Sequence, residues 1–127
     1  MATLFWLAFS VTFLLLLTSL WAGLKGRRKL HLWVAPSSFV ALTIAVIFAE
    51  RLVNSRDFPA DDLEFHLHFA YSAAGLAVPV IISGIWLARS GAPSVRILHR
   101  SCVALFMLAV LTATTTGIWV YSLSTPK

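Results

Sequence analysis

The sequence predicts an all-α integral membrane protein in which four transmembrane helices form an up-down bundle. Hydrophobic residues make up 59% of the chain and charged residues only 12%, about half the charged share of a typical soluble domain. Four apolar runs each approach or exceed the roughly 20 residues that a helix needs to cross the hydrocarbon core. The segments between these runs are too short to form a second folding unit. We therefore expect residues 1–127 to form a single four-helix transmembrane domain.

The first predicted helix covers residues 2–24, a run rich in Leu and Phe with no charged side chain before Lys25. A cleaved signal peptide begins with basic residues and ends at a cleavage site between small residues. No base precedes Trp6, and the run leads directly into a basic segment. We interpret this run as a retained membrane anchor.

The second predicted helix covers residues 30–49, and the short basic segment before it allows only a tight turn between antiparallel helices. Pro36 lies early in this helix and lacks a backbone donor, which frees the carbonyl one turn before it. We expect the hydroxyl groups of Ser37 and Ser38 to bond to this carbonyl.

The third predicted helix covers residues 62–88 and follows a polar segment. The polar stretch from residue 50 to 64, which includes the predicted helix start, holds every acidic residue of the chain: Glu50, Asp57, Asp61, Asp62 and Glu64. Pro59 makes a continuous helix through the segment unfavourable. Asp61 and Glu64 have the spacing of a capping box, which predicts a helix start near Asp62. Pro79 predicts a kink near the middle of the helix.

The fourth predicted helix covers residues 98–123. Ala109, Ala113 and Gly117 are four residues apart and therefore form one stripe of small side chains. Because small residues let helices approach closely in a membrane, we expect this stripe to pack against the third helix.

Basic residues predict the orientation in the membrane. Seven of them lie in or beside the two segments that join the first helix to the second and the third to the fourth, without any acid: Lys25, Arg27, Arg28, Lys29, Arg89, Arg96 and Arg100. By the positive-inside rule these segments face the cytoplasm, so both termini lie on the outer side of the inner (cytoplasmic) cell membrane. We expect the lipid bilayer, rather than nucleic acid, to account for the net charge of +5.

Two histidines begin helices that an up-down bundle makes parallel: His31 in the second helix and His99 in the fourth. Diagonal helices in such a bundle have axes about 14 Å apart if neighbouring helices pack at about 10 Å. Two imidazoles reaching inward across this diagonal are able to hold a haem iron from both faces, which makes haem b the candidate cofactor. The alternative is that both histidines simply lie among lipid phosphates and interfacial water.

His66 and His68 are two residues apart, so a helix turns them in nearly opposite directions. His68 lies deeper in the apolar run, and we expect it to face the bundle as a further haem-binding candidate. We expect His66 to lie on the surface and to pair with Asp62 one turn earlier. The alternative for His68 is a hydrogen-bonded histidine near the outer interface.

Cys102 lies one turn after His99, and the two side chains together resemble part of a soft copper site. No methionine cluster or second cysteine accompanies them, so we expect no metal other than haem iron. Arg100 points away from this face and reaches lipid phosphate. Because the acidic residues lie across the membrane from His99 and Cys102, the sequence gives little support to nucleophilic catalysis there, and we expect a non-catalytic accessory or electron-transfer protein rather than an enzyme.

A resemblance covers nearly the whole chain. A leading anchor helix, a histidine after the basic turn, and His99 followed by Arg100 resemble a bacterial four-helix membrane protein family of unknown function that is associated with cytochrome c oxidase and its maturation. The ending from Thr116 through Gly117 to Tyr121 resembles it as well. The resemblance implies functional roles for His31, His68 (or His66), His99, Arg100, Thr116, Gly117 and Tyr121.

The family resemblance implies an accessory or assembly protein, or a small subunit, of a respiratory electron-transfer complex of the haem-copper oxidase type. Its partners are then other membrane subunits of that complex. A weaker similarity to transmembrane haem b cytochromes implies a cytochrome that keeps its haem and transfers electrons. A purely structural membrane subunit is the third interpretation.

Overall fold

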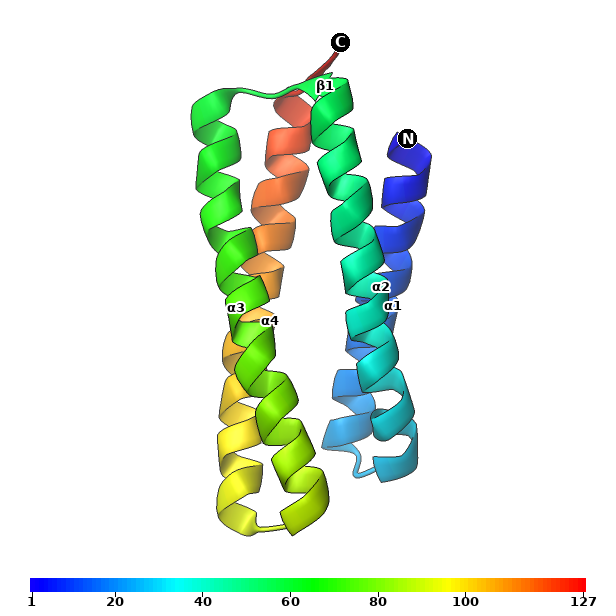
Figure 1. Cartoon of the computed structure of the whole chain (residues 1–127), viewed down its shortest axis with the longest axis vertical. Coiled ribbons are helices and arrows are strands. Elements are labelled where there is room, and N and C mark those ends of the chain that lie inside the picture. Colours follow the sequence, from blue (N-terminus) through cyan, green and yellow to red (C-terminus); the bar gives the residue numbers. More distant parts are fainter. The chain divides into compact units, whose positions relative to one another are not determined.

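The computed structural model describes all 127 residues and consists almost entirely of four α-helices (Figure 1). The helices are α1 (Ala2–Leu24), α2 (Arg28–Ser55), α3 (Ala60–Ser90) and α4 (Pro93–Leu123). The two-residue strands β1 (Arg56–Asp57) and β2 (Thr125–Pro126) pair with each other. All four helices are long and apolar enough to cross a membrane, as the sequence predicts.

The chain forms two compact units. Residues 1–57, joined by residues 126–127, make up the first unit, and residues 58–125 make up the second. In the first unit α1 packs against α2, and in the second α3 packs against α4. We call these helix pairs the first hairpin and the second hairpin.

Each hairpin turns at a glycine with a left-handed backbone. Gly26 has φ +67° between α1 and α2, and Gly91 has φ +62° between α3 and α4. Glycine adopts this conformation without the steric cost that a Cβ atom brings. In the second hairpin Gly91 caps α3 by donating its N–H to the Leu87 carbonyl, and Pro93 follows at the start of α4. The predicted tight turn after the first helix is confirmed.

The first hairpin packs mainly along small and polar side chains, with one leucine on each helix. On α2 the buried residues Ser38, Ala45 and Leu52 are seven residues apart, which is the spacing of left-handed helix packing. They follow His31 at the same spacing. The buried residues of α1 are Thr12, Leu16, Ser19 and Ala22. Because lipid is as apolar as leucine, such small residues stabilise the pair by close backbone approach.

The second hairpin buries larger residues on α4. Phe106 is only 2% exposed, and Val110 and Val120 lie on the same stripe of the helix. On α3 the buried residues are Ala73, Val80 and Ser83. Elsewhere large apolar side chains point outward, a pattern that suits helices in lipid.

The polar segment between α2 and α3 is shorter than the sequence predicts. α2 continues past Glu50 to Ser55, and α3 begins at Ala60. Pro59 is the residue before α3, and no side chain bonds to the helix start, so the predicted capping box of Asp61 and Glu64 is wrong. The physical reason is that proline fixes its own φ and presents no N–H, which allows a helix to begin directly after it.

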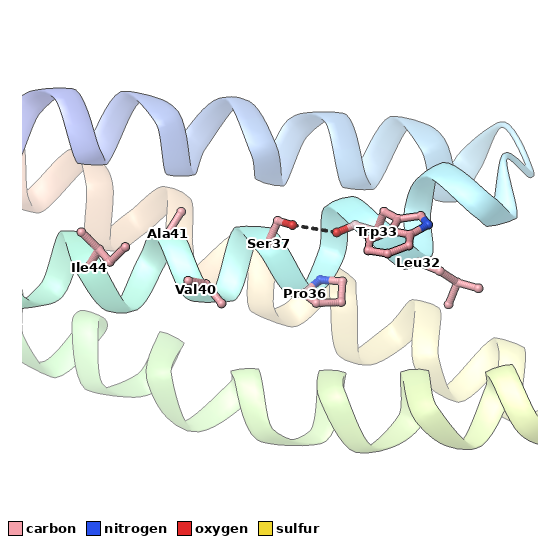
Figure 2. Close-up of a pocket in the computed structure, with 7 residues that line it drawn as sticks. All are labelled: Leu32, Trp33, Pro36, Ser37, Val40, Ala41 and Ile44. Carbon is pink, nitrogen blue, oxygen red and sulfur yellow. Dashed lines mark hydrogen bonds between the residues drawn. The ribbon is translucent and has the colours of Figure 1, made fainter.

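The expected role of the two serines after Pro36 is also wrong. The Ser37 hydroxyl donates to the Trp33 carbonyl at 2.8 Å (Figure 2), and the Ser38 hydroxyl donates to the Ala35 carbonyl at 2.7 Å. Neither bonds to the carbonyl of Leu32, which the proline frees. A helical serine reaches the carbonyl three or four residues before it, so Leu32 is too far back for either hydroxyl.

Candidate functional site

His31 of α2 contacts α1 through its Nδ1 atom. This atom lies 2.8 Å from the Ser19 carbonyl oxygen and 3.3 Å from the Ser19 hydroxyl. Because a carbonyl only accepts, Nδ1 carries the ring proton and the neutral ring has its lone pair on Nε2. Gly23 makes room for the ring, since a Cβ atom there would lie 3.3 Å from Nδ1.

His99 of α4 contacts α3 in the same way. Its Nδ1 atom lies 2.9 Å from the Ser83 hydroxyl oxygen. That hydroxyl donates its own proton to the Val80 carbonyl at 3.2 Å, so it accepts the Nδ1 proton of His99. A Cβ atom at Gly84 would lie 3.1 Å from Cε1 of the ring. The tautomer that makes both hydrogen bonds at once has the lone pair of neutral His99 on Nε2.

His66 of α3 makes the third contact of this kind, with α4. Its Nδ1 atom lies 3.0 Å from the Thr116 hydroxyl oxygen, and this hydroxyl donates to the Thr112 carbonyl at 2.9 Å. A Cβ atom at Gly117 would lie 2.9 Å from Cε1 of the ring. We call each of these three arrangements a histidine contact: a ring whose Nδ1–H donates to a serine or threonine of the neighbouring helix while the ring lies against a glycine.

The second hairpin holds two histidine contacts at different levels. Seventeen positions separate His66 from Ser83 on α3, and seventeen separate His99 from Thr116 on α4. At 1.5 Å of rise per residue the two contacts are about 25 Å apart along the helices. His66 and His99 therefore cannot bind one iron atom together.

The orientations expected for His66 and His68 are wrong. His68 is exposed, and its Nδ1 atom bonds to the Glu64 carbonyl of its own helix at 2.8 Å. His66 bonds to Thr116 rather than to Asp62. The buried residues Ala73 and Val80 explain the difference, because they follow His66 at seven-residue intervals and so lie on the same face of α3.

The remaining predicted residues surround these contacts. Cys102 is a half-buried free thiol one turn after His99, and Arg100 is exposed. Tyr121 is half-buried near the end of α4. Thr116 and Gly117 belong to the contact of His66, which confirms that Gly117 packs against α3. No group of three or more His, Cys, Asp or Glu side chains is arranged to hold a metal ion.

Sequence reasoning missed the residues that receive the rings of His31 and His99. Ser19 and Gly23 serve the first of these rings, and Ser83 and Gly84 serve the second. In the second hairpin an internal sequence repeat indicates which residues receive the histidine rings. His66 is followed after sixteen residues by Ser-Gly-Ile-Trp, and His99 is followed after sixteen residues by Thr-Gly-Ile-Trp. In an antiparallel pair, equal spacing on both helices sets each histidine opposite the hydroxyl of the other repeat.

A shallow hollow on α2 offers no comparable chemistry. Its lining residues all belong to this one helix (Figure 2): Leu32, Trp33, Pro36, Ser37, Val40, Ala41 and Ile44. None of these side chains titrates near neutral pH, and the surface is mainly apolar. The hollow is therefore suited to apolar contact, while the polar chemistry of the chain is concentrated in the histidine contacts.

The histidine contacts are therefore the candidate functional sites of the two hairpins. His31 lies just after the basic turn of the first hairpin, and His99 lies just after the turn of the second. A comparison of the chain with protein-family models gives no match, and comparisons with curated proteins and with solved structures give none either.

Proposed function

We propose that the protein is a small accessory or assembly protein, or a small subunit, of a respiratory complex of the haem-copper oxidase type, and that His31 and His99 contact haem. One observation carries the proposal: Nδ1 of both rings lies within hydrogen-bond distance of an oxygen on the neighbouring helix, and the tautomer that donates to this oxygen has its lone pair on Nε2. A hydrogen bond at one ring nitrogen is the usual support for a histidine that binds metal through the other nitrogen.

The donor set fits haem better than a bare metal ion. Haem brings four nitrogen ligands of its own and needs only axial imidazoles from the protein. A bare transition metal needs three or four protein ligands, and the chain has no such group. When bound, haem would supply one-electron redox chemistry or would be cargo for the partner complex.

The same proposal places the protein in the inner membrane and gives its orientation there. The basic residues of both hairpin turns support an orientation with the turns in the cytoplasm and both termini outside the inner membrane. His31 and His99, each near a turn, then lie toward the cytoplasmic side. Partner subunits would contact the large apolar side chains that point away from the hairpin interiors.

An absorption spectrum of the purified protein with added haem tests the proposal. We expect a Soret band whose intensity falls when His31 or His99 is replaced by alanine, because each replacement removes one imidazole. His68→Ala is the matched control, since this exposed ring bonds only to its own helix. In the host, His31→Ala and His99→Ala should lower the yield of active oxidase while the protein still inserts. Normal haem binding and normal oxidase yield in the His31 and His99 double variant would refute the proposal.

The alternative is a haem b cytochrome that keeps its cofactor. The supported imidazole rings favour it to the same degree, because a permanent axial ligand needs a fixed ring orientation. The two functions predict different haem contents and different co-purifying proteins when the protein is isolated from the native membrane. A cytochrome retains haem with sharp reduced α and β bands, whereas an assembly protein is isolated largely without haem and together with oxidase subunits.

A further inference from the structure

The two histidines of the proposed function share a sequence motif. Residues 28–31 read Arg-Lys-Leu-His, and residues 96–99 read Arg-Ile-Leu-His. In both hairpins the motif Arg-x-Leu-His therefore lies near the start of the second helix. His66 makes the same ring contact, but Leu63 is at the position where the motif has arginine.

Helix geometry brings the arginine and the histidine of each motif to one face. Residues three apart on a helix are neighbours on its surface. Arg28 is the first residue of α2, and Arg96 follows closely after the start of α4 at Pro93. Both arginines are exposed, while His31 and His99 are half-buried. Each guanidinium is thus about one helical turn nearer the helix start, and so nearer the water, than the imidazole beside it.

A haem has the chemistry to contact both groups at once. His31 or His99 would hold the iron, and Arg28 or Arg96 would be within reach of a propionate carboxylate. Arginine is the side chain best suited to a carboxylate, because its planar guanidinium donates two parallel hydrogen bonds. The first turns of α2 and α4 hold no acidic residue that would repel an anionic ligand.

The contact of His66 shows the opposite charge pattern. The first turn of α3 carries Asp61 and Asp62, and the last turn of α4 has no basic residue. A carboxylate-bearing ligand at His66 would meet acidic groups and no arginine. The chain therefore contains an internal comparison: the same hydrogen-bonded imidazole with an arginine at two positions and without one at the third.

We propose that Arg28 and Arg96 bind the carboxylate groups of haem, so that Arg-x-Leu-His is a two-part recognition motif for an anionic metalloporphyrin. His66, which lacks the arginine, is a helix-to-helix contact and does not bind haem. The inference rests on the proposed function and adds to it the class of ligand and the residues that select it. The same arginines would also attract lipid phosphate, so the test separates the two anions.

The test compares haem with haem dimethyl ester, which keeps the iron and loses both carboxylate charges. The full chain is placed in phosphatidylcholine nanodiscs, where no anionic lipid competes, and binding is followed by the Soret band. We expect the unchanged protein to bind haem about tenfold more tightly than the ester, as one charge-assisted hydrogen bond predicts. Arg28→Gln and Arg96→Gln should each weaken haem binding by about that factor and leave ester binding unchanged.

Three variants complete the design. Arg96→Lys keeps the charge and the membrane orientation and should lose part of the preference, because an ammonium group does not make the bidentate bond. Leu63→Gln changes the equivalent position before His66 and should change neither affinity. His99→Ala should weaken haem and ester alike, because it removes an iron ligand rather than a carboxylate partner.

The outcomes separate the inference from the proposed function. Equal affinities for haem and ester, or haem binding that both arginine replacements leave unchanged, would overturn the inference while His99→Ala still weakens binding. An arginine effect that appears only in nanodiscs with phosphatidylglycerol would also overturn it and would assign the arginines to lipid phosphate. Binding of both porphyrins that is unaffected by loss of His31 and His99 would overturn the proposed function itself.

Discussion

Three histidine rings of this chain meet a neighbouring helix by one physical arrangement. A glycine leaves space for the ring, and an oxygen of the neighbouring helix accepts the Nδ1 proton. An imidazole without a partner is costly inside a membrane, where no water replaces the missing bond. The arrangement thus removes the cost of burying one ring nitrogen and joins the two helices at the same point.

Replacing a glycine of a histidine contact by alanine should cost more stability where less space is left for the added methyl group. A Cβ atom would lie 2.9 Å from the ring at Gly117, 3.1 Å at Gly84 and 3.3 Å at Gly23. We expect Gly117→Ala to destabilise the second hairpin by about 1–3 kcal/mol, with a smaller effect for Gly84→Ala. Reversible unfolding in mixed micelles measures the change.

Gly75→Ala is the matched control on α3. No atom lies within 4 Å of a Cβ atom at this position, and alanine is the better helix former by up to about 1 kcal/mol. Gly75→Ala should therefore be neutral or stabilising. Equal losses at Gly75 and Gly117 would show that the rings do not occupy the space in front of the glycines.

The hydroxyl of Ser83 should determine which nitrogen of His99 carries the proton. Ser83→Ala removes the oxygen at 2.9 Å from Nδ1 and so weakens the preference of the neutral ring for the Nδ1–H form. We expect the ¹⁵N chemical shifts of the His99 ring to change from a single Nδ1–H form to a mixture. The loss of one interhelical bond in a membrane should cost about 0.6–1.7 kcal/mol.

Ser72→Ala serves as the comparison for this prediction. Its hydroxyl bonds to the His68 carbonyl within its own helix, so its removal should leave the His99 ring unchanged. An unchanged His99 spectrum in Ser83→Ala would mean that another group holds the proton on Nδ1.

At the scale of the helix, buried residues recur at about seven-residue spacing on the contact face of each hairpin. On α2 the buried residues Ser38, Ala45 and Leu52 show this spacing and continue it from the half-buried His31. On α4 the large buried residue of the stripe is Phe106. Van der Waals packing along this face, rather than exclusion of water, stabilises a helix pair in lipid.

Phe106→Ala should therefore weaken the association of α3 with α4. The side chain is 2% exposed, and its loss leaves a cavity in the contact face that lipid does not fill. We expect a loss of about 3 kcal/mol in reversible unfolding. Leu108→Ala is the control on the same helix, since Leu108 is 63% exposed and should cost little. Similar losses for both residues would show that α4 is rotated relative to this description.

At the scale of the whole chain, the unequal distribution of charge predicts the orientation in the membrane. Single cysteines at Ser55 and Ser90, introduced after replacement of Cys102, test it with a membrane-impermeant thiol reagent added outside intact cells. Ser55 lies at the end of α2, and Ser90 lies at the end of α3. We expect labelling at Ser55 and none at Ser90. The opposite pattern would invert the orientation and move His31 and His99 to the outer side.

The number of helices and their approximate positions follow from the sequence alone. A run of about 20 apolar residues is determined by the thickness of the hydrocarbon core, which is a property of lipid and needs no knowledge of the neighbours. The tight turn after the first helix follows for a similar reason, because the segment is too short for anything else, and Gly26 makes this turn with a left-handed backbone. The predicted ends at residues 49, 62 and 98 fall inside the observed ends at Ser55, Ala60 and Pro93, since charged residues continue a helix readily outside lipid.

Only the tertiary structure decided which histidine faces a neighbour and what it binds there. His66 and His68 differ by about 200° around α3, and the apolar pattern on a lipid-exposed helix does not distinguish the two faces, because lipid and protein neighbours are equally apolar. The packing of α4 selects His66 and sets Thr116 opposite its ring. The same holds for Ser19 and Ser83, whose positions beside His31 and His99 depend on the length of each turn and on the register between antiparallel helices.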